Sequence, residues 1–334
     1  MTRVALDLMG GDHAPASVVD GALLVAEETP EVVVVLVGPP ELAAELLAER
    51  GQPDRFEVVA ATEVVAMDED PARATRAKRD ATVRVCAELV RDGRVDAMVS
   101  VGSTGAVLTA AVLALGRLPG ILRPALATVL PTQTEPLVFL DAGANPEASV
   151  ELLSQYALAG SAYASLRLGL PEPRVGLLTI GEEAGKGDAV RKAAYDALAA
   201  LPIRFIGAVE GRDVPLGGVA DVIVTDGFTG NVLLKGLEGA VAMLTALLVT
   251  AANSTEKRAT AAETLRPAFD EVAAKLSPDS ASGAVLLGLD GVCVVGHGAA
   301  GPRAVASCVA VAAEAAREGL VPKIAAALAE TVPA

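Results

Sequence analysis

Short apolar runs alternate with longer segments of helical periodicity along most of this 334-residue chain. The runs are rich in valine and isoleucine and mostly lack alternation with polar residues, which is typical of strands buried on both faces. The expected strands are residues 4–8, 32–37, 56–60, 97–101, 127–130, 137–140, 175–180, 204–209, 222–225 and 292–295. The expected helices are residues 16–28, 41–50, 71–91, 105–115, 146–168, 188–200, 231–252, 255–276 and 302–318. This order predicts an α/β fold built on a doubly wound, mostly parallel sheet.

Residues 231–285 differ from the rest because two long helical stretches follow each other there without a strand between them. Both stretches are alanine-rich and amphipathic, and exposed helix pairs of this kind bury their apolar stripe by association. We therefore predict a helical hairpin that protrudes from the sheet and forms a dimer. No repeat or low-complexity linker divides the chain, so residues 1–334 are expected to form one α/β domain, with a soft subdivision near 130–150.

Six of the apolar runs end in a short, glycine-containing polar turn that opens a helical segment. These turns are residues 7–12, 102–105, 141–145, 181–187, 226–231 and 296–301. In an open parallel sheet, turns at the carboxyl ends of the strands converge on one crevice, where ligands bind. Glycine lets backbone N–H groups approach a ligand closely, and a helix N-terminus attracts an anion. The pattern therefore predicts one crevice that binds a phosphate or a carboxylate.

Composition and charge argue against a nucleic-acid-binding protein. The formal net charge is −15 and aromatic residues make up 2% of the chain, whereas nucleic-acid binding needs a basic face and stacking rings. Three cysteines without a CxxC pair and two histidines without a cluster predict neither a disulfide framework nor a metal site. The chain enters its first strand without a secretory leader, so a cytoplasmic protein is expected.

One uncharged stretch, residues 98–116, is about as long as a membrane span. It carries serine, threonine and glycine at positions 102–105, where a span should be most apolar. We therefore interpret this stretch as a buried strand, a turn and a buried helix of a soluble protein.

Nucleotide-binding motifs are missing from the turns. No GxGxxG sequence follows any of the expected strands. The segment from Gly181 to Lys186 resembles a P-loop, but three residues rather than four separate Gly181 from Gly185, and Gly187 stands where Mg²⁺ binding needs serine or threonine. We therefore expect anion binding without a nucleotide cofactor.

Two side chains in the turns are candidates for chemistry. Lys186 lies at an expected helix start, where a cation is disfavoured by the helix dipole unless an anion is bound. The alternative is a solvated lysine that pairs with Glu182 or Glu183. His297, between two glycines, is a candidate proton donor or neutral hydrogen-bond donor, and its alternative is structural packing.

Polar side chains at other turns have capping as their alternative role. Asn145 and Asn231 each end a turn at an expected helix N-cap. Ser103 and Thr104 open the helix after residues 97–101, where hydroxyl and N–H groups suit a phosphate. No GxSxG sequence is present and no cysteine lies in a glycine turn, so the attacking group of any acyl transfer would be a bound substrate.

A dense basic cluster lies on the helix that is expected to open at Pro71. Its members are Arg73, Arg76, Lys78 and Arg79. On a chain of net charge −15, such a cluster favours docking of an acidic ligand or partner. The alternative is a solvated helix face.

The turns, taken in order, resemble one protein family nearly from end to end. The segments that carry the resemblance are residues 7–12, 76–80, 100–106, 141–145, 181–183, 226–231, 286–291 and 297–298. In their order and spacing they are similar to the bacterial phosphate acyltransferases of phospholipid synthesis. The resemblance implies a fold similar to the isocitrate/isopropylmalate dehydrogenase and phosphotransacetylase group, and a cytosolic homodimer that visits the membrane.

The resemblance and the turns together suggest acyl transfer from acyl-carrier protein, or from acyl-CoA, to inorganic phosphate, with no cofactor. Lys186, Asn231 and His297 are the expected catalytic residues: Lys186 neutralises phosphate, Asn231 donates to the oxyanion, and His297 polarises it or assists the thiolate. The expected phosphate- and substrate-binding residues are Gly10, Gly11, Asp12, Gly102, Ser103, Thr104, Gly105, Asn145 and Asp226. Three alternatives stay open: a short-chain phosphotransacetylase, a 2-hydroxy-acid dehydrogenase, and a non-catalytic protein that binds acyl-carrier protein.

Overall fold

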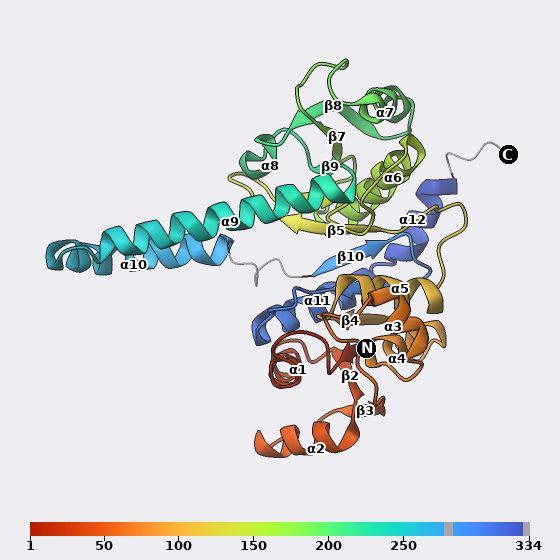
Figure 1. Cartoon of the computed structure of the whole chain (residues 1–334), viewed down its shortest axis with the longest axis vertical. Coiled ribbons are helices and arrows are strands. Elements are labelled where there is room, and N and C mark those ends of the chain that lie inside the picture. Colours follow the sequence, from red (N-terminus) through yellow and green to blue (C-terminus); the bar gives the residue numbers. More distant parts are fainter. Residues whose placement is uncertain (277–282, 330–334) are drawn as a thin grey trace.

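The computed structural model describes residues 1–276 and 283–329. In this part of the chain, eleven strands form one sheet in the order β3-β2-β1-β4-β11-β10-β5-β6-β9-β7-β8 (Figure 1). The strands are β1 (Thr2–Asp7), β2 (Val32–Gly38), β3 (Glu57–Ala60), β4 (Ala97–Ser100), β5 (Ala125–Leu130), β6 (Leu137–Leu140), β7 (Arg174–Thr179), β8 (Arg204–Glu210), β9 (Val222–Val224), β10 (Ala284–Leu287) and β11 (Val292–Val295).

Helices cover both faces of the sheet, as the doubly wound prediction required. They are α1 (Ala16–Glu28), α2 (Pro40–Glu49), α3 (Pro71–Ala77), α4 (Thr82–Arg91), α5 (Thr104–Ala114), α6 (Val150–Arg167), α7 (Ala189–Ala199), α8 (Asp213–Leu216), α9 (Gly227–Ala252), α10 (Glu256–Leu276), α11 (Pro302–Arg317) and α12 (Leu320–Ala329). One core cluster lies beneath α1, α2, α6, α7, α11 and α12, and the other lies beneath α4, α5, α8 and the base of α9. Strands such as β4 and β11 are buried along their whole length, which explains their unbroken apolar sequences.

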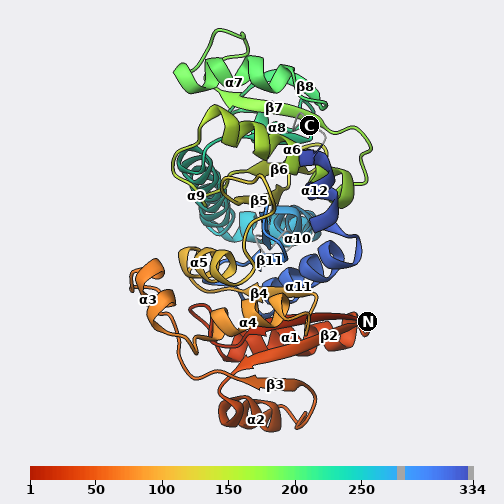
Figure 2. The ribbon, with the colours of Figure 1, turned by 90° about the vertical axis from the view of Figure 1, so that its right-hand side faces the viewer.

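Strand direction divides the sheet into two parallel groups. β1, β2, β3, β4 and β11 run parallel to one another, and so do β6, β7, β8 and β9. β10 and β5 lie between the groups, and the pairs β11–β10, β10–β5 and β5–β6 are all antiparallel. These three reversals leave the two groups running in opposite directions. Figure 2 shows the first group at one end of the molecule and the second group at the other.

The assumption behind the single predicted crevice, that all six strands run the same way, is therefore wrong, and the shared crevice itself stays a prediction. The turns at 7–12, 102–105 and 296–301 follow strands of the first group, and the other three follow strands of the second. Their carboxyl ends lie at opposite edges of the sheet because the two groups run in opposite directions. The single-crevice argument assumed that all the strands run the same way.

Several elements differ from the expectation, and helices α8 and α12 were not expected at all. Strand β10 was not expected, because its four residues between antiparallel neighbours carry too short a signal. The helix expected at 71–91 is broken into α3 and α4, where Asp80 leaves the helix to accept hydrogen bonds from the Thr62 N–H at 2.7 Å and hydroxyl at 2.6 Å. Helix α9 begins at Gly227 rather than at residue 231.

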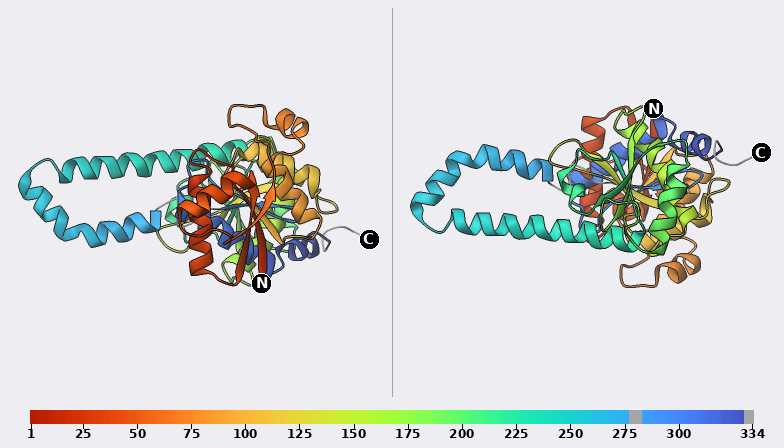
Figure 3. Two further views of the ribbon diagram at one scale, coloured as in Figure 1. Left: turned by 90° about the horizontal axis from the view of Figure 1, so that it is seen from below. Right: turned by 90° about the horizontal axis from the view of Figure 1, so that it is seen from above.

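The protruding hairpin is present. Helices α9 and α10 extend side by side well beyond the sheet (Figures 1 and 3), and residues 277–282 of the predicted segment lie outside the described residues. No residue of α10 is buried, and Leu244 and Leu247 of α9 are 57% and 60% exposed. Among the described helices, α9 is the one long and apolar enough to cross a membrane, judged by length and composition alone.

Candidate active site

Three predicted turns meet at the edge where β1, β4 and β11 end. The N–H of Asp12 donates to the carbonyl of Gly298 at 2.7 Å, which joins the first turn to the last. A Cβ added at Gly10 would lie 2.9 Å from the backbone nitrogen of Gly102, so only glycine allows the first and second turns to approach this closely. The structure therefore brings Gly10, Gly11, Asp12, Gly102 and the His297 turn together.

The buried carboxylate of Asp7 holds these turns in place through hydrogen bonds. The hydroxyl of Ser100 donates to Oδ2 of Asp7 at 2.6 Å, and the N–H of Met9 donates to Oδ1 at 3.2 Å. Burial raises the pKa of the Asp7 carboxyl, although these hydrogen bonds act in the opposite direction. The turn backbone is thus fixed by the protein before any ligand binds.

The second turn ends at the N-terminus of α5. Ser103 occupies the N-cap position, and among the described residues its side chain makes no capping hydrogen bond there. Capping, the alternative role of Ser103, is therefore not what this geometry shows. The first N–H groups of α5, at Thr104 and Gly105, have no intrahelical acceptor. A recess of about 10 Å³ is lined by residues that include Gly10, Gly102 and Ser103, with room for about one water molecule.

The turn after β6 is organised by a buried carboxylate. Asp141 accepts hydrogen bonds from the N–H groups of Gly143 at 3.0 Å, Ala144 at 2.8 Å and Asn145 at 2.8 Å. Burial raises the pKa of the Asp141 carboxyl, while these N–H groups oppose the rise. The Asn145 amide donates to the carbonyl of Pro124 at 2.7 Å and to other protein groups. Asn145 is buried, so its amide holds this turn together rather than facing a ligand.

The turn after β9 is the capped start of α9. Asp226 is the N-cap, and its carboxylate accepts from the N–H of Thr229 at 2.8 Å and from the Arg191 guanidinium. Arg191 also donates to the carbonyl of Leu178 at 3.2 Å. Burial opposes ionisation of Asp226, but the hydrogen bonds from Thr229 and Arg191 outweigh it and lower its pKa. Asp226 is thus a charged cap with protein partners, and Arg191 is a residue that the sequence prediction missed.

Asn231 lies inside α9, one turn after the cap. The capping role left open for it is wrong, because the helix begins at Gly227 and Asp226 caps it. Asn231 is exposed, and a Cβ added at Gly143 would lie 3.6 Å from its Oδ1. Its amide therefore faces the backbone of the β6 turn without a hydrogen-bonding partner among residues 1–276 and 283–329.

Lys235 connects the two edges of the sheet. It lies four residues after Asn231, on the same face of α9, and its Nζ is 3.3 Å from Nε2 of His297. Helix α9 starts at the end of β9 and His297 follows β11, so the contact joins the two strand groups. Asn231 and Lys235 thus form a polar strip along α9, which contacts His297 through Lys235. Lys235 was not among the predicted residues.

Lys186 lies in an exposed loop between β7 and α7. Its N–H donates to the carbonyl of Glu183 at 2.9 Å, while the carboxylate of Glu182 pairs with Arg212 at 3.1 Å. Helix α7 begins at Ala189, so Lys186 is not at a helix start. The loop flanks the end of β9 because β7 is its neighbour in the sheet. A role for Lys186 in neutralising phosphate stays a prediction.

Comparison with known proteins identifies the family. A family model described as fatty acid synthesis protein matches residues 2–323. The chain is 45% identical to the phosphate acyltransferase of Desulfitobacterium hafniense over 97% of its own length and 96% of the relative's. It is 44% identical to the Heliobacterium modesticaldum phosphate acyltransferase over 99% and 98%. The chain belongs to the phosphate acyltransferase family.

Solved structures share the fold of this phosphate acyltransferase. A phosphotransacetylase from Streptococcus pyogenes matches with a TM-score of 0.64 and 17% identity over 95% of each chain. A branched-chain phosphotransacylase from Enterococcus faecalis matches with a TM-score of 0.59 and 14% identity, covering 95% of this chain and 99% of that one. The family resemblance and the expected likeness to the phosphotransacetylase fold are both confirmed.

The basic cluster of this phosphate acyltransferase is smaller than the sequence predicts. Lys78 turns inward, where its Nζ donates to the carbonyl of Val64 at 2.7 Å and to Glu69 at 2.5 Å. Arg73, Arg76 and Arg79 are exposed and form no ion pair within the described ranges. A docking role for these three arginines, on α3 and the segment after it, stays a prediction.

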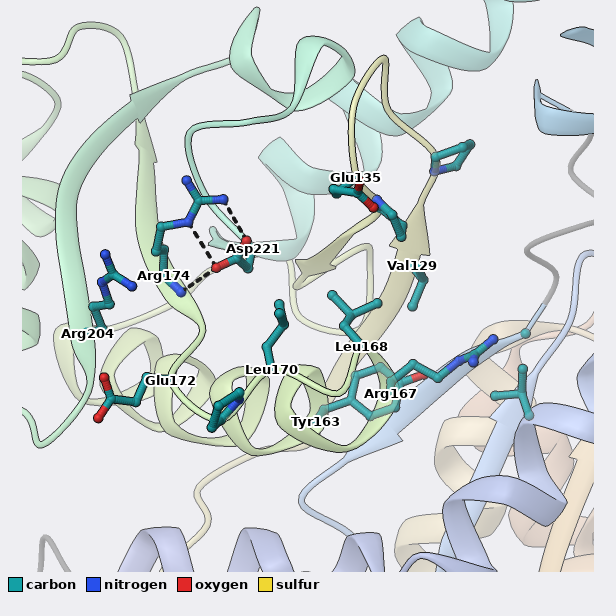
Figure 4. A pocket seen from close by; sticks show the side chains of 15 residues that line it. Val129, Glu135, Tyr163, Arg167, Leu168, Leu170, Glu172, Arg174, Arg204 and Asp221 are labelled. Carbon is teal, nitrogen blue, oxygen red and sulfur yellow. Dashed lines mark hydrogen bonds and ion pairs between the residues drawn. The ribbon is translucent and has the colours of Figure 1, made fainter.

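A larger cavity lies away from all of these residues. Its volume is about 1150 Å³, and Leu168, Leu170 and Tyr163 line it together with charged groups (Figure 4). Arg174 is bound to Asp221 at 2.7 Å, so that ion pair is already satisfied. None of the sequence-predicted site residues lines this cavity.

Proposed function

We propose that this phosphate acyltransferase moves an acyl group from acyl-carrier protein, or from acyl-CoA, to inorganic phosphate. A phosphate oxygen forms a bond to the thioester carbonyl carbon, the carbon–sulfur bond breaks, and the thiolate leaves with the electron pair. The products are an acyl-phosphate and the thiolate of the carrier, which takes up a proton from water to give the free thiol. The observation that carries the proposal is the cluster of donor-rich turns beside His297 in a chain without a nucleotide motif.

Each residue of the site has a distinct part in this reaction. The turn at 102–105 and the start of α5 hold phosphate through N–H groups, and Lys186 adds positive charge. Asn231 and His297 donate hydrogen bonds to the oxygen that becomes negative as phosphate attacks. The leaving thiol has an ordinary pKa of about 8.5, so its departure needs little help from an acid.

The direct test is turnover with and without phosphate. Purified protein is incubated with palmitoyl-carrier protein, and acyl-phosphate is followed by mass spectrometry. We expect product only when phosphate is present. Faster turnover of acetyl-CoA than of long-chain donors would favour the short-chain phosphotransacetylase. Calorimetric binding of nicotinamide nucleotide would favour the dehydrogenase, and phosphate-independent binding of the carrier without turnover would indicate a non-catalytic protein.

Carrier-protein docking is proposed at Arg73, Arg76 and Arg79. The enzyme is acidic overall, so an acidic carrier must be attracted by a local basic patch. Arg76→Glu is expected to raise KM for acyl-carrier protein about fivefold at low salt, with a smaller effect at high salt. Arg317→Glu, the same charge change at the end of α11, is the control. Equal effects of the two variants, or binding that strengthens with salt, would count against the patch.

A homodimer formed by the hairpin is also proposed. Leu244 and Leu247 are exposed on α9, and an apolar stripe of this kind is stabilised by burial in a helix bundle. Leu247→Glu is expected to convert a dimer to a monomer in sedimentation experiments at micromolar concentration. Leu113→Glu changes an exposed leucine of α5 and should leave the oligomeric state unchanged. A monomeric parent protein would remove the proposal.

We also propose that the protein is cytoplasmic and makes transient contact with the inner face of the membrane. The hairpin tip is the candidate contact, since α9 is apolar and protrudes. Residues 253–258 at the tip are polar and include Lys257 and Arg258, which suits anionic lipid headgroups rather than insertion. Co-sedimentation with vesicles that contain or lack anionic lipid tests this contact.

A further inference from the structure

The contact between Lys235 and His297 brings two hydrogen-bond donors together. Nδ1 of His297 accepts a hydrogen bond from the N–H of Ala299 at 3.2 Å. A neutral imidazole has one lone pair on its ring nitrogens, so this bond places the ring hydrogen on Nε2. That N–H then faces the ammonium of Lys235, whose Nζ lies 3.3 Å away.

No protonation state of the ring removes this conflict. If Nε2 instead carried the lone pair and accepted from Lys235, Nδ1–H would face the N–H of Ala299. In the imidazolium form, both ring nitrogens would face donors. An acceptor that lies beside the pair, within hydrogen-bond distance of both Nζ and Nε2, satisfies both donors, and a negatively charged oxygen does so best because the bonds become charge-assisted.

Two carboxylates lie near this pair: Glu238 contacts Lys235, and Oδ2 of Asp12 would lie 3.4 Å from a Cβ added at Gly298, the neighbour of His297. The His297 turn contacts the β1 turn through the bond between Asp12 and Gly298, and β11 is hydrogen-bonded to β4 beside the start of α5. Glu238, one turn further along α9, accepts from Lys235 at 2.8 Å, and both side chains of this pair are well exposed. An exposed pair of this kind is weak, so it leaves Lys235 able to turn to an anion.

We propose that Lys235 is a phosphate-binding residue, and that it holds inorganic phosphate jointly with Nε2–H of His297. The inference rests on the proposed function and adds to it a cation that the sequence did not indicate. In this arrangement the phosphate bridges α9 and the β11 turn. Nε2–H of His297 then serves the phosphate in place of the oxyanion, and the amide of Asn231, one helical turn away, is the donor to the acyl carbonyl oxygen.

The test separates phosphate binding from folding and from donor binding. Lys235→Met is expected to raise KM for phosphate about tenfold or more, with KM for the acyl donor unchanged. Lys235→Arg keeps the charge and should recover most of the affinity. Glu238→Gln removes the competing carboxylate and should lower KM for phosphate about twofold. Lys323→Met, the same change on an exposed position of α12, is the control.

Binding of inorganic phosphate to the enzyme without an acyl donor, followed by phosphorus NMR line broadening, gives a readout that does not depend on turnover. Loss of broadening in Lys235→Met, with wild-type circular dichroism, supports the assignment. An unchanged KM for phosphate and unchanged broadening in that variant overturn it, even if the wild type forms acyl-phosphate. Absence of acyl-phosphate formation by the wild type would instead overturn the proposed function.

Discussion

Alanine at position 230 is expected to destabilise the protein by about 4 kcal/mol or more, or to prevent folding. A Cβ added at Gly230 would lie 1.9 Å from the carbonyl oxygen of Asp141 and 3.2 Å from Cγ2 of Thr225. The Asp141 backbone cannot move aside easily, because its buried side chain is tied to the backbone N–H groups of the same turn. The start of helix α9 would have to move away from the β6 turn. The resulting loss of stability is measured as the free energy of unfolding in urea.

Two other glycines of the same helix provide matched controls. Gly236 and Gly239 have no atom within 4 Å of an added Cβ, so alanine there meets no obstacle. Helix propensity then predicts that Gly236→Ala and Gly239→Ala stabilise the protein by up to about 1 kcal/mol. A Gly230→Ala protein as stable as these controls would show that α9 is not seated against the β6 turn.

Asn231→Ala is expected to lower kcat by about a hundredfold without unfolding the protein. The Asn231 amide is exposed and lies against Gly143, so truncation removes a donor and leaves no buried gap. One preorganised donor to a developing oxyanion contributes about this much to the rate of acyl transfer. The measurement is phosphate-dependent release of the carrier thiol, with the KM values for both substrates determined separately.

Two further variants sharpen this experiment. Asn231→Asp keeps the shape of the side chain but replaces the donor with an acceptor, so kcat should fall at least as far. Asn253→Ala makes the same substitution at the outer end of α9, where the amide donates to the carbonyl of Val249 at 2.9 Å, and should leave kcat unchanged. A kcat for Asn231→Ala within about threefold of the wild type would remove the oxyanion role.

The sequence predicted the local elements better than their assembly. Buried valine-rich runs and glycine turns identify strands such as β4 and β11, because burial on both faces leaves a continuous apolar signal. The direction of the second strand group could not be predicted in the same way. It depends on β10, whose four residues carry no periodicity that distinguishes a strand from other buried segments.

The candidate site shows a similar division. The glycines of the turns indicated Gly10, Gly102 and the His297 turn, because close backbone approach requires glycine and is therefore visible in the sequence. No sequence feature distinguishes Lys235, since a lysine in the middle of a helix is most often solvated. Its spacing of four residues from Asn231 indicates a shared helix face and nothing more. The burial of the Asn145 amide depends on Pro124, 21 residues away, and a local pattern does not record that contact.

Helix α9 carries both Asn231, the proposed oxyanion donor, and the exposed leucines Leu244 and Leu247 of its outer half. A contact that fixes the outer half of α9 would therefore also fix the position of Asn231 and Lys235 along the helix axis, because a helix is stiff along its axis. A shift by a single residue would move those groups by about 1.5 Å, enough to spoil the alignment of an attacking oxygen. A partner bound to the exposed leucines of the outer half would therefore also fix the position of the site groups at the base of α9.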